Sequence, residues 1–173
     1  MILATHAIVG AAVGRFFPEN PFLALITGFI SHFLIDAIPH WQYPLKSIVK
    51  DKNNPKDLMR EDMVVGEDFI GDLTLITIDL LSGLVLALYI FGTKGNLLNP
   101  SVLLGALGGI LPDALTFAYF KFRVEPLATI QRLQIFANRE GKNHIFENSH
   151  FKGFLSQTAF ASLVIAVSKI IFR

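Results

Sequence analysis

The stretch Ser31-His32-Phe33-Leu34-Ile35-Asp36-Ala37-Ile38-Pro39-His40-Trp41 places polar groups directly after an apolar segment with a helical pattern. His32 and Asp36 are four residues apart, so a helix puts them on one face, one turn above the other. Pro39 cannot continue the helix, and His40 just beyond it can fold back toward Asp36. Imidazole and carboxylate groups at this spacing offer a divalent metal ion two or three ligands from one rigid element. The simpler interpretation is a hydrogen bond between His32 and Asp36 inside a packed bundle, with His40 at the surface.

The composition indicates a membrane protein. Of the 173 residues, 52% are hydrophobic and 17% are charged, whereas about a quarter of the residues in a soluble domain are charged. The formal net charge of +1 gives no argument for nucleic acid, and we expect no nucleic-acid partner. The lack of cysteine excludes thiolate ligands and disulfides. The first residues lack the basic region of a signal peptide and are expected to belong to the mature fold.

The apolar runs predict an all-α fold, a polytopic helical membrane bundle of about five helices that forms one domain over residues 1–173. The first helix is short for a full span and is expected to pack inside the bundle. The fourth is expected to be interrupted at Pro112. The expected helices are 3–17, 22–38, 69–91, 99–122 and 154–171, and the expected polar loops are about 42–68 and 121–153. An amphipathic piece of the second loop, 127–136, would lie at the membrane interface.

Glycines spaced for close helix packing occur in the first and fourth of these helices. Small residues three or four apart let the backbones of neighbouring membrane helices approach each other. We therefore assign these glycines to packing. They are Gly10, Gly14, Gly105, Gly108 and Gly109.

The alternation of helix direction puts both polar loops on the same side of the membrane. These loops carry most of the lysine and arginine residues, so the positive-inside rule makes that side cytoplasmic. We therefore expect a multi-pass protein of the inner (cytoplasmic) membrane, in contact with its lipids, with the candidate site facing the cytoplasm.

The same topology brings three acids to one half of the membrane: Asp36, Asp79 and Asp113. Each would cost on the order of 2.5–3.5 kcal/mol if it were ionised and unpaired at the centre of a membrane helix. The one basic residue well inside the first four apolar segments, Arg15, maps to the opposite side. Histidine, protonation or a metal ion must therefore neutralise the acids, and His6 and His150 lie on the same side. A divalent metal combines best with this mixture of nitrogen and oxygen ligands.

Three motifs together resemble a family of predicted membrane-bound metal-dependent hydrolases that includes a LexA-regulated inner-membrane protein. They are Thr5-His6-xxx-Gly10-xxx-Gly14, Ser31-His32-xxx-Asp36-xx-Pro39-His40-Trp41 and Gly105-xx-Gly108-Gly109-xx-Pro112-Asp113. The His-xxx-Asp-xxx-His core is also similar to the ligand helix of zinc-dependent phospholipases C and related single-strand nucleases, in which the last histidine lies further along. The family resemblance implies that the metal ligands or their immediate neighbours are His6, His32, Asp36, His40 and Asp113. His150 matches the family pattern in part. We add Asp79 to the candidate ligands because of its expected depth in the membrane.

The leading hypothesis is therefore a hydrolase in which zinc, or alternatively manganese or iron, activates water against an ester or phosphoester bond. Asp36 or Asp113 would bridge metals or act as the catalytic base. A lipid phosphoester or another small molecule at headgroup level would be the substrate. The alternative is a non-enzymatic ion or proton conductor or carrier, because chains of aspartate and histidine inside membranes also form proton relays.

Overall fold

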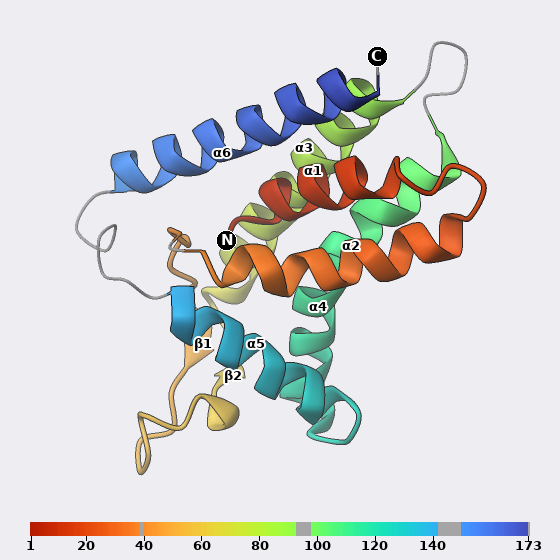
Figure 1. The fold of residues 1–173 in the computed structure, drawn as a ribbon. Coiled ribbons are helices and arrows are strands. Elements are labelled where there is room, and N and C mark those ends of the chain that lie inside the picture. Colours follow the sequence, from red (N-terminus) through yellow and green to blue (C-terminus); the bar gives the residue numbers. More distant parts are fainter. Residues whose placement is uncertain (39, 93–97, 142–149, 173) are drawn as a thin grey trace.

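The computed structural model describes residues 1–38, 40–92, 98–141 and 150–172, with the backbone alone at 139–141 and 150. The fold is all-α, as predicted (Figure 1). The helices are α1 (Leu3–Gly14), α2 (Pro21–Asp36), α3 (Phe69–Phe91), α4 (Pro100–Phe122), α5 (Leu127–Gly141) and α6 (His150–Ile171). Between α2 and α3 lie β1 (Ile48–Val49), a 3-10 turn η1 (Leu58–Arg60) and β2 (Asp62–Met63). The two strands pair antiparallel and were not expected from the sequence.

The short helix α1 forms the centre of the bundle. It contacts α2, α3, α4 and α6, and it lies between α2 and α6 in Figure 1. Nearly all of its residues are buried, including Ala7 and Ala11 at 0% exposure. A helix that is apolar all round has no face to offer to solvent. The expectation that this segment packs inside the bundle is therefore confirmed.

Glycines bring α4 against α1 and α2 at backbone contact. A Cβ atom at Gly105 would lie 2.4 Å from the carbonyl oxygen of Gly10, and one at Gly109 would lie 2.4 Å from the carbonyl oxygen of His6. On the other side, a Cβ at Gly108 would lie 2.2 Å from the carbonyl oxygen of Leu25. These distances leave no room for a side chain, as expected for small-residue packing in membranes.

Local sequence signals explain where α2 and α4 begin. Asn20 accepts a hydrogen bond from the backbone nitrogen of Leu23 at 3.0 Å, and Asn99 accepts one from that of Ser101 at 3.0 Å. A proline follows each asparagine, where its missing N–H costs nothing. The expected interruption of α4 at Pro112 is wrong, because the helix continues through it to Phe122. Pro112 is buried, and packing against neighbours sustains a helix that loses one donor.

Among the described residues, three helices, α3, α4 and α6, are long and apolar enough to cross a bilayer. The outward faces of α3 and α6 are apolar, with side chains such as Ile78, Val85 and Leu163 more than half exposed. An apolar surface of this extent marks a protein that is solvated by lipid. The chain is therefore a helical membrane protein.

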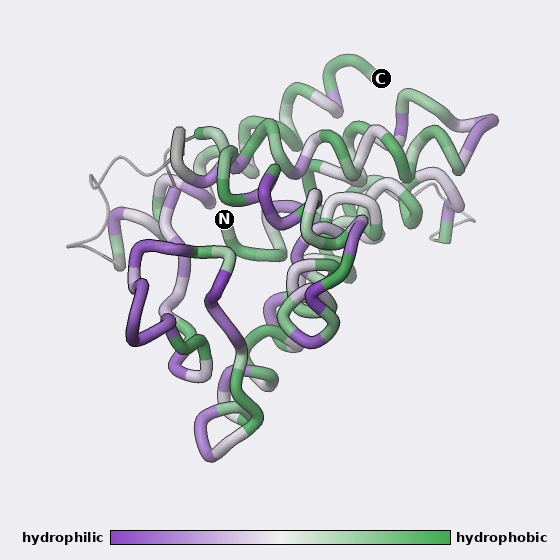
Figure 2. The backbone as a smooth tube through the Cα atoms, turned by 90° about the horizontal axis from the view of Figure 1, so that it is seen from below, coloured by the Kyte–Doolittle hydropathy of each residue, from purple (hydrophilic) through white to green (hydrophobic). Residues whose placement is uncertain are grey.

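The polar segment between α2 and α3 packs against the end of α4 and against α5. Tyr119 donates a hydrogen bond to the carbonyl oxygen of Met59 at 3.0 Å, and the ammonium of Lys121 lies 3.1 Å from the Asp62 carboxylate. Figure 2 shows that hydrophobic residues dominate the helices, while hydrophilic residues gather in the segment between α2 and α3. The described parts of both polar stretches thus lie together at one end of the helices, beside the C-terminal end of α2 (Figure 1).

Candidate metal centre

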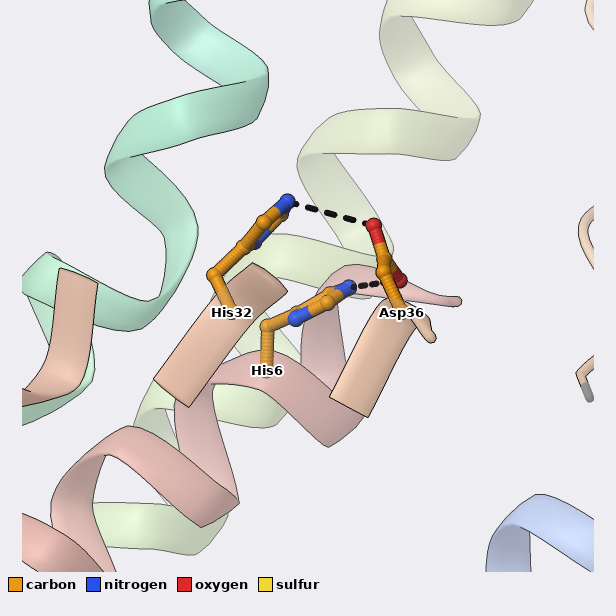
Figure 3. A group of neighbouring side chains, drawn as sticks. All are labelled: His6, His32 and Asp36. Carbon is orange, nitrogen blue, oxygen red and sulfur yellow. Dashed lines mark ion pairs between the residues drawn. The ribbon is translucent and has the colours of Figure 1, made fainter. Parts of the chain in front are cut away.

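Two histidines and one aspartate from α1 and α2 form a fully buried cluster (Figure 3). His6 of α1 lies with its Nε2 atom 3.2 Å from Asp36 Oδ1, and His32 of α2 lies with its Nε2 atom 3.3 Å from Asp36 Oδ2. One ligand atom of each residue lies within 4.8 Å of the others. The three residues are at most 1% exposed. The structure therefore brings together residues 6, 32 and 36, which the sequence placed at one depth.

Two of the histidines are held in the tautomer that a metal ligand needs. The Nδ1 atom of His32 lies 2.8 Å from the carbonyl oxygen of Gly109, and that of His40 lies 2.8 Å from the carbonyl oxygen of Ile38. A carbonyl only accepts, so each Nδ1 carries the proton and donates it, which leaves Nε2 with a lone pair when the ring is neutral. Histidines that bind metals are oriented by such an outer partner.

The centre of the cluster has the chemistry of a cation site. The lone pair of a neutral His32 would face a carboxylate oxygen, and two acceptors at 3.3 Å repel each other unless a proton or a cation lies between them. Neither ring nitrogen of His6 has a hydrogen-bond partner among the described residues, although both are buried. The N-terminal ammonium of Met1 pairs with Asp36 Oδ1 at 3.0 Å, whereas no lysine or arginine side chain pairs with this carboxylate in the described part of the chain. Buried nitrogens such as those of His6 are rarely left without a partner, and a metal ion among the three residues would supply one.

His40 and Asp113 stand at the rim of this cluster. The Nε2 atom of His40 lies 3.8 Å from Asp36 Oδ1, and Asp113 Oδ1 lies 3.8 Å from the Nε2 atom of His32. Burial lowers the pKa of His40, so its imidazole is neutral at neutral pH. The side chain of Asp113 is 34% exposed, so the cluster meets solvent on this side.

Amide side chains of α5 lie along the rim of the cluster, and sequence reasoning missed them. Gln134 Nε2 donates to Asp113 Oδ1, and Asn138 Nδ2 donates to Asp36 Oδ2 at 3.4 Å. The Oε1 atom of Gln134 accepts from the Thr116 hydroxyl, which fixes the direction of the amide. Gln131, Gln134 and Asn138 share one face of the amphipathic helix through spacings of three and four residues. That polar face was the feature of the sequence from which these amides could have been predicted to lie at the site.

Asp79 of α3 contacts the first turn of α1 rather than the histidines. Its carboxylate accepts hydrogen bonds from the backbone nitrogens of Leu3 at 2.7 Å and Ala4 at 3.3 Å. The Tyr43 hydroxyl donates to the same carboxylate at 3.2 Å, and burial together with the charge of Asp79 raises the pKa of that hydroxyl. A carboxylate at a helix N-terminus satisfies free N–H groups and the helix dipole. Asp79 therefore fixes the start of α1, three residues before His6.

Replacing Asp79 with alanine is expected to lower stability by about 1–2 kcal/mol, the usual cost of losing a helix cap, while the metal content per chain stays unchanged. Thermal unfolding of detergent-purified protein and elemental analysis of the same sample measure the two quantities. Asp79→Asn keeps one oxygen acceptor, so its stability should lie between that of the wild type and that of Asp79→Ala. Loss of bound metal in Asp79→Asn at unchanged stability would instead make Asp79 a ligand, as the sequence predicted.

His150, the remaining predicted ligand, is the first residue of α6. Its side chain lies outside the described residues, as does the segment 142–149 before it. Its part in the site stays a prediction.

The described donor set consists of imidazole nitrogens and carboxylate oxygens. These ligands suit zinc, manganese and ferrous iron, and the lack of thiolates disfavours sites for softer ions. A search with protein-family models, with curated proteins and with solved structures found no match to this chain.

Proposed function

We propose that this chain is a membrane-bound metal-dependent hydrolase that acts on ester or phosphoester bonds of lipids or membrane-proximal molecules. The observation that carries the proposal is the buried cluster of His6, His32 and Asp36, in which a carbonyl of α4 holds the Nε2 atom of His32 ready to bind an ion. The resemblance in the three sequence motifs points to the same class of protein. A membrane location and a site open at its rim fit a substrate at headgroup level.

The residues of the cluster divide into ligands and a base. His6, His32 and Asp36 would hold the metal, since all three are buried and one ligand atom of each lies within 4.8 Å of the others. When bound, a zinc ion, or manganese or iron in its place, supplies a Lewis acid and acidifies water. Asp113 is the partly exposed carboxylate beside the cluster, so it is the residue that accepts a proton from the attacking water. Gln134 donates a hydrogen bond to Asp113 and orients it.

The orientation in the membrane is part of the proposal. The site lies at the end of the helices where the described polar stretches meet, and these stretches hold basic residues such as Lys121 and Arg123. By the positive-inside rule this end faces the cytoplasm of a cell whose inner membrane holds the protein.

Metal analysis of the detergent-purified protein tests the proposal. We expect a tightly bound transition metal and hydrolysis of phosphomonoester, phosphodiester or carboxylic ester substrates, which a chelator abolishes and zinc, manganese or iron restores. His32→Ala should lose metal and activity. The matched control is Asp51→Asn, because Asp51 pairs with Arg60 in the exposed segment between β1 and η1.

Protein without bound metal, in which His32→Ala changes neither the fold nor any metal affinity, would contradict the hydrolase and favour the ion or proton conductor. Bound metal without hydrolysis of any substrate class would keep the metal centre and reject the enzyme.

A further inference from the structure

The two carboxylate oxygens of Asp36 face different sets of side chains. Oδ1 lies 3.2 Å from the Nε2 atom of His6 and 3.8 Å from that of His40. Oδ2 lies 3.3 Å from the Nε2 atom of His32, which in turn lies 3.8 Å from Asp113 Oδ1. The carboxylate thus divides the cluster into two sets of ligands that have Asp36 alone in common.

The rings of His6 and His32 are stacked, and this arrangement separates their lone pairs. Their centroids are 4.0 Å apart and their planes differ by 20°. The lone pair of an imidazole nitrogen lies in the plane of its ring, and a zinc ion sits about 2.0–2.1 Å from that nitrogen. Two nearly parallel rings therefore direct their lone pairs at two positions, one in each plane. Figure 3 shows each ring directed at its own oxygen of Asp36.

Each set of ligands also has its own outer support. In the first set, the carbonyl oxygen of Ile38 orients His40, and the N-terminal ammonium of Met1 donates a hydrogen bond to Asp36 Oδ1 at 3.0 Å. In the second set, the carbonyl oxygen of Gly109 orients His32. There the amide nitrogen of Gln134 donates to Asp113 and lies 3.5 Å from the Nε2 atom of His32. The carboxylates of both positions thus attract positive charge, and Asp36 Oδ1 already has the Met1 ammonium beside it.

We propose that the site binds two divalent metal ions bridged by Asp36. His6 and His40 complete the first position, and His32 and Asp113 complete the second. This inference rests on the metal centre of the proposed function. It adds that the centre holds two ions and that Asp36 bridges them. Paired metal ions in phosphatases and nucleases lie about 3.5–4 Å apart, which matches the 4.0 Å between the stacked rings.

The charges of such a centre select its substrate. Two divalent ions bring four positive charges and the N-terminal ammonium of Met1 brings a fifth, Asp36 and Asp113 bring two negative charges, and neutral imidazoles bring none. The surplus favours an anionic substrate whose oxygens contact both ions, and a phosphoester has this form. Phosphoesters should therefore be cleaved in preference to uncharged carboxylic esters.

The number and coupling of the bound ions test the proposal. Detergent-purified full chain is stripped with a chelator, titrated with Mn²⁺ and measured by elemental analysis and electron paramagnetic resonance. We expect two ions per chain and the signal of an exchange-coupled pair. His40→Ala and Asp113→Asn each change one ligand of one position and leave His6, His32 and Asp36 in place. Each should weaken one of the two binding steps by about 10-fold or more and replace the coupled signal with that of an isolated ion, whereas Asp51→Asn should retain both.

A wild-type protein that saturates at one ion, or that holds two ions without coupling, would overturn the two-ion centre. If that protein still hydrolysed its substrates in a metal-dependent way, the proposed function would stand. A protein that bound no metal at all would fail both proposals.

Discussion

Replacing Gly105 with alanine is expected to destabilise the protein by about 3 kcal/mol, at the upper end of the usual cost of overpacking. The new Cβ would lie 2.4 Å from the carbonyl oxygen of Gly10 and 2.9 Å from the Cα atom of Gly14. Both neighbours are backbone atoms, so α4 would have to move away from α1. Thermal unfolding of detergent-purified protein should show a midpoint lowered by roughly 10 °C.

The matched control is Gly71→Ala in α3, where an added Cβ meets no atom within 4 Å. Alanine is the better helix former, by about 0.5–1 kcal/mol, so this variant should be at least as stable as the wild type. If Gly105→Ala proved equally harmless, the close contact of α1 and α4 would be refuted.

Replacing Asp36 with asparagine is expected to remove metal binding altogether. The side chain keeps its size and can still accept a hydrogen bond from Asn138, so the bundle should hold. The carboxylate, however, is the group that the Nε2 atom of His6 and the Nε2 atom of His32 both face. Loss of a supporting residue costs about 10–100-fold in metal affinity, and loss of the shared ligand should cost more than that. Elemental analysis after gel filtration measures the metal that remains bound per chain. Hydrolysis should be lost in parallel.

Asp36→Asn also separates the roles of the acids. Asp113→Asn should keep an ion at the first position, bind the second ion more weakly and lose turnover, because its carboxylate belongs to the second position. An Asp36→Asn protein that bound metal as tightly as the wild type would show that the buried cluster is only a hydrogen-bonded core, which is the simpler interpretation of the motif.

Much of the bundle was predictable because strong local signals coincide with long apolar runs. The bounds of α3 and α4 agree with the expected 69–91 and 99–122, since turn residues such as Asn99 and Gly92 flank them. The first two helices end earlier than expected, at Gly14 and Asp36, and the last begins earlier, at His150. Apolar composition alone does not tell where a helix gives way to a turn.

The meeting of residues 6, 32 and 36 followed from helix periodicity and from the depth of the acids. The depth of Asp79 was a weaker guide, because a carboxylate that holds a helix N-terminus and one that holds an ion occupy the same level. Gln134 and Asn138 were missed since amides on an amphipathic helix look like a solvated face. Only the packing of α5 onto α4 and α2 shows that this face is turned inward.

Gly109 joins the architecture of the bundle to the candidate metal centre. Its missing side chain lets α4 touch the backbone of α1 at His6, and its carbonyl oxygen orients the ring of His32. If α4 slides or tilts against α1, the Gly109 carbonyl oxygen that orients His32 therefore moves relative to His6. Bilayer thickness and lateral pressure act on α4, the long helix of this pair, so we expect the surrounding lipid to influence any ion affinity of the proposed centre.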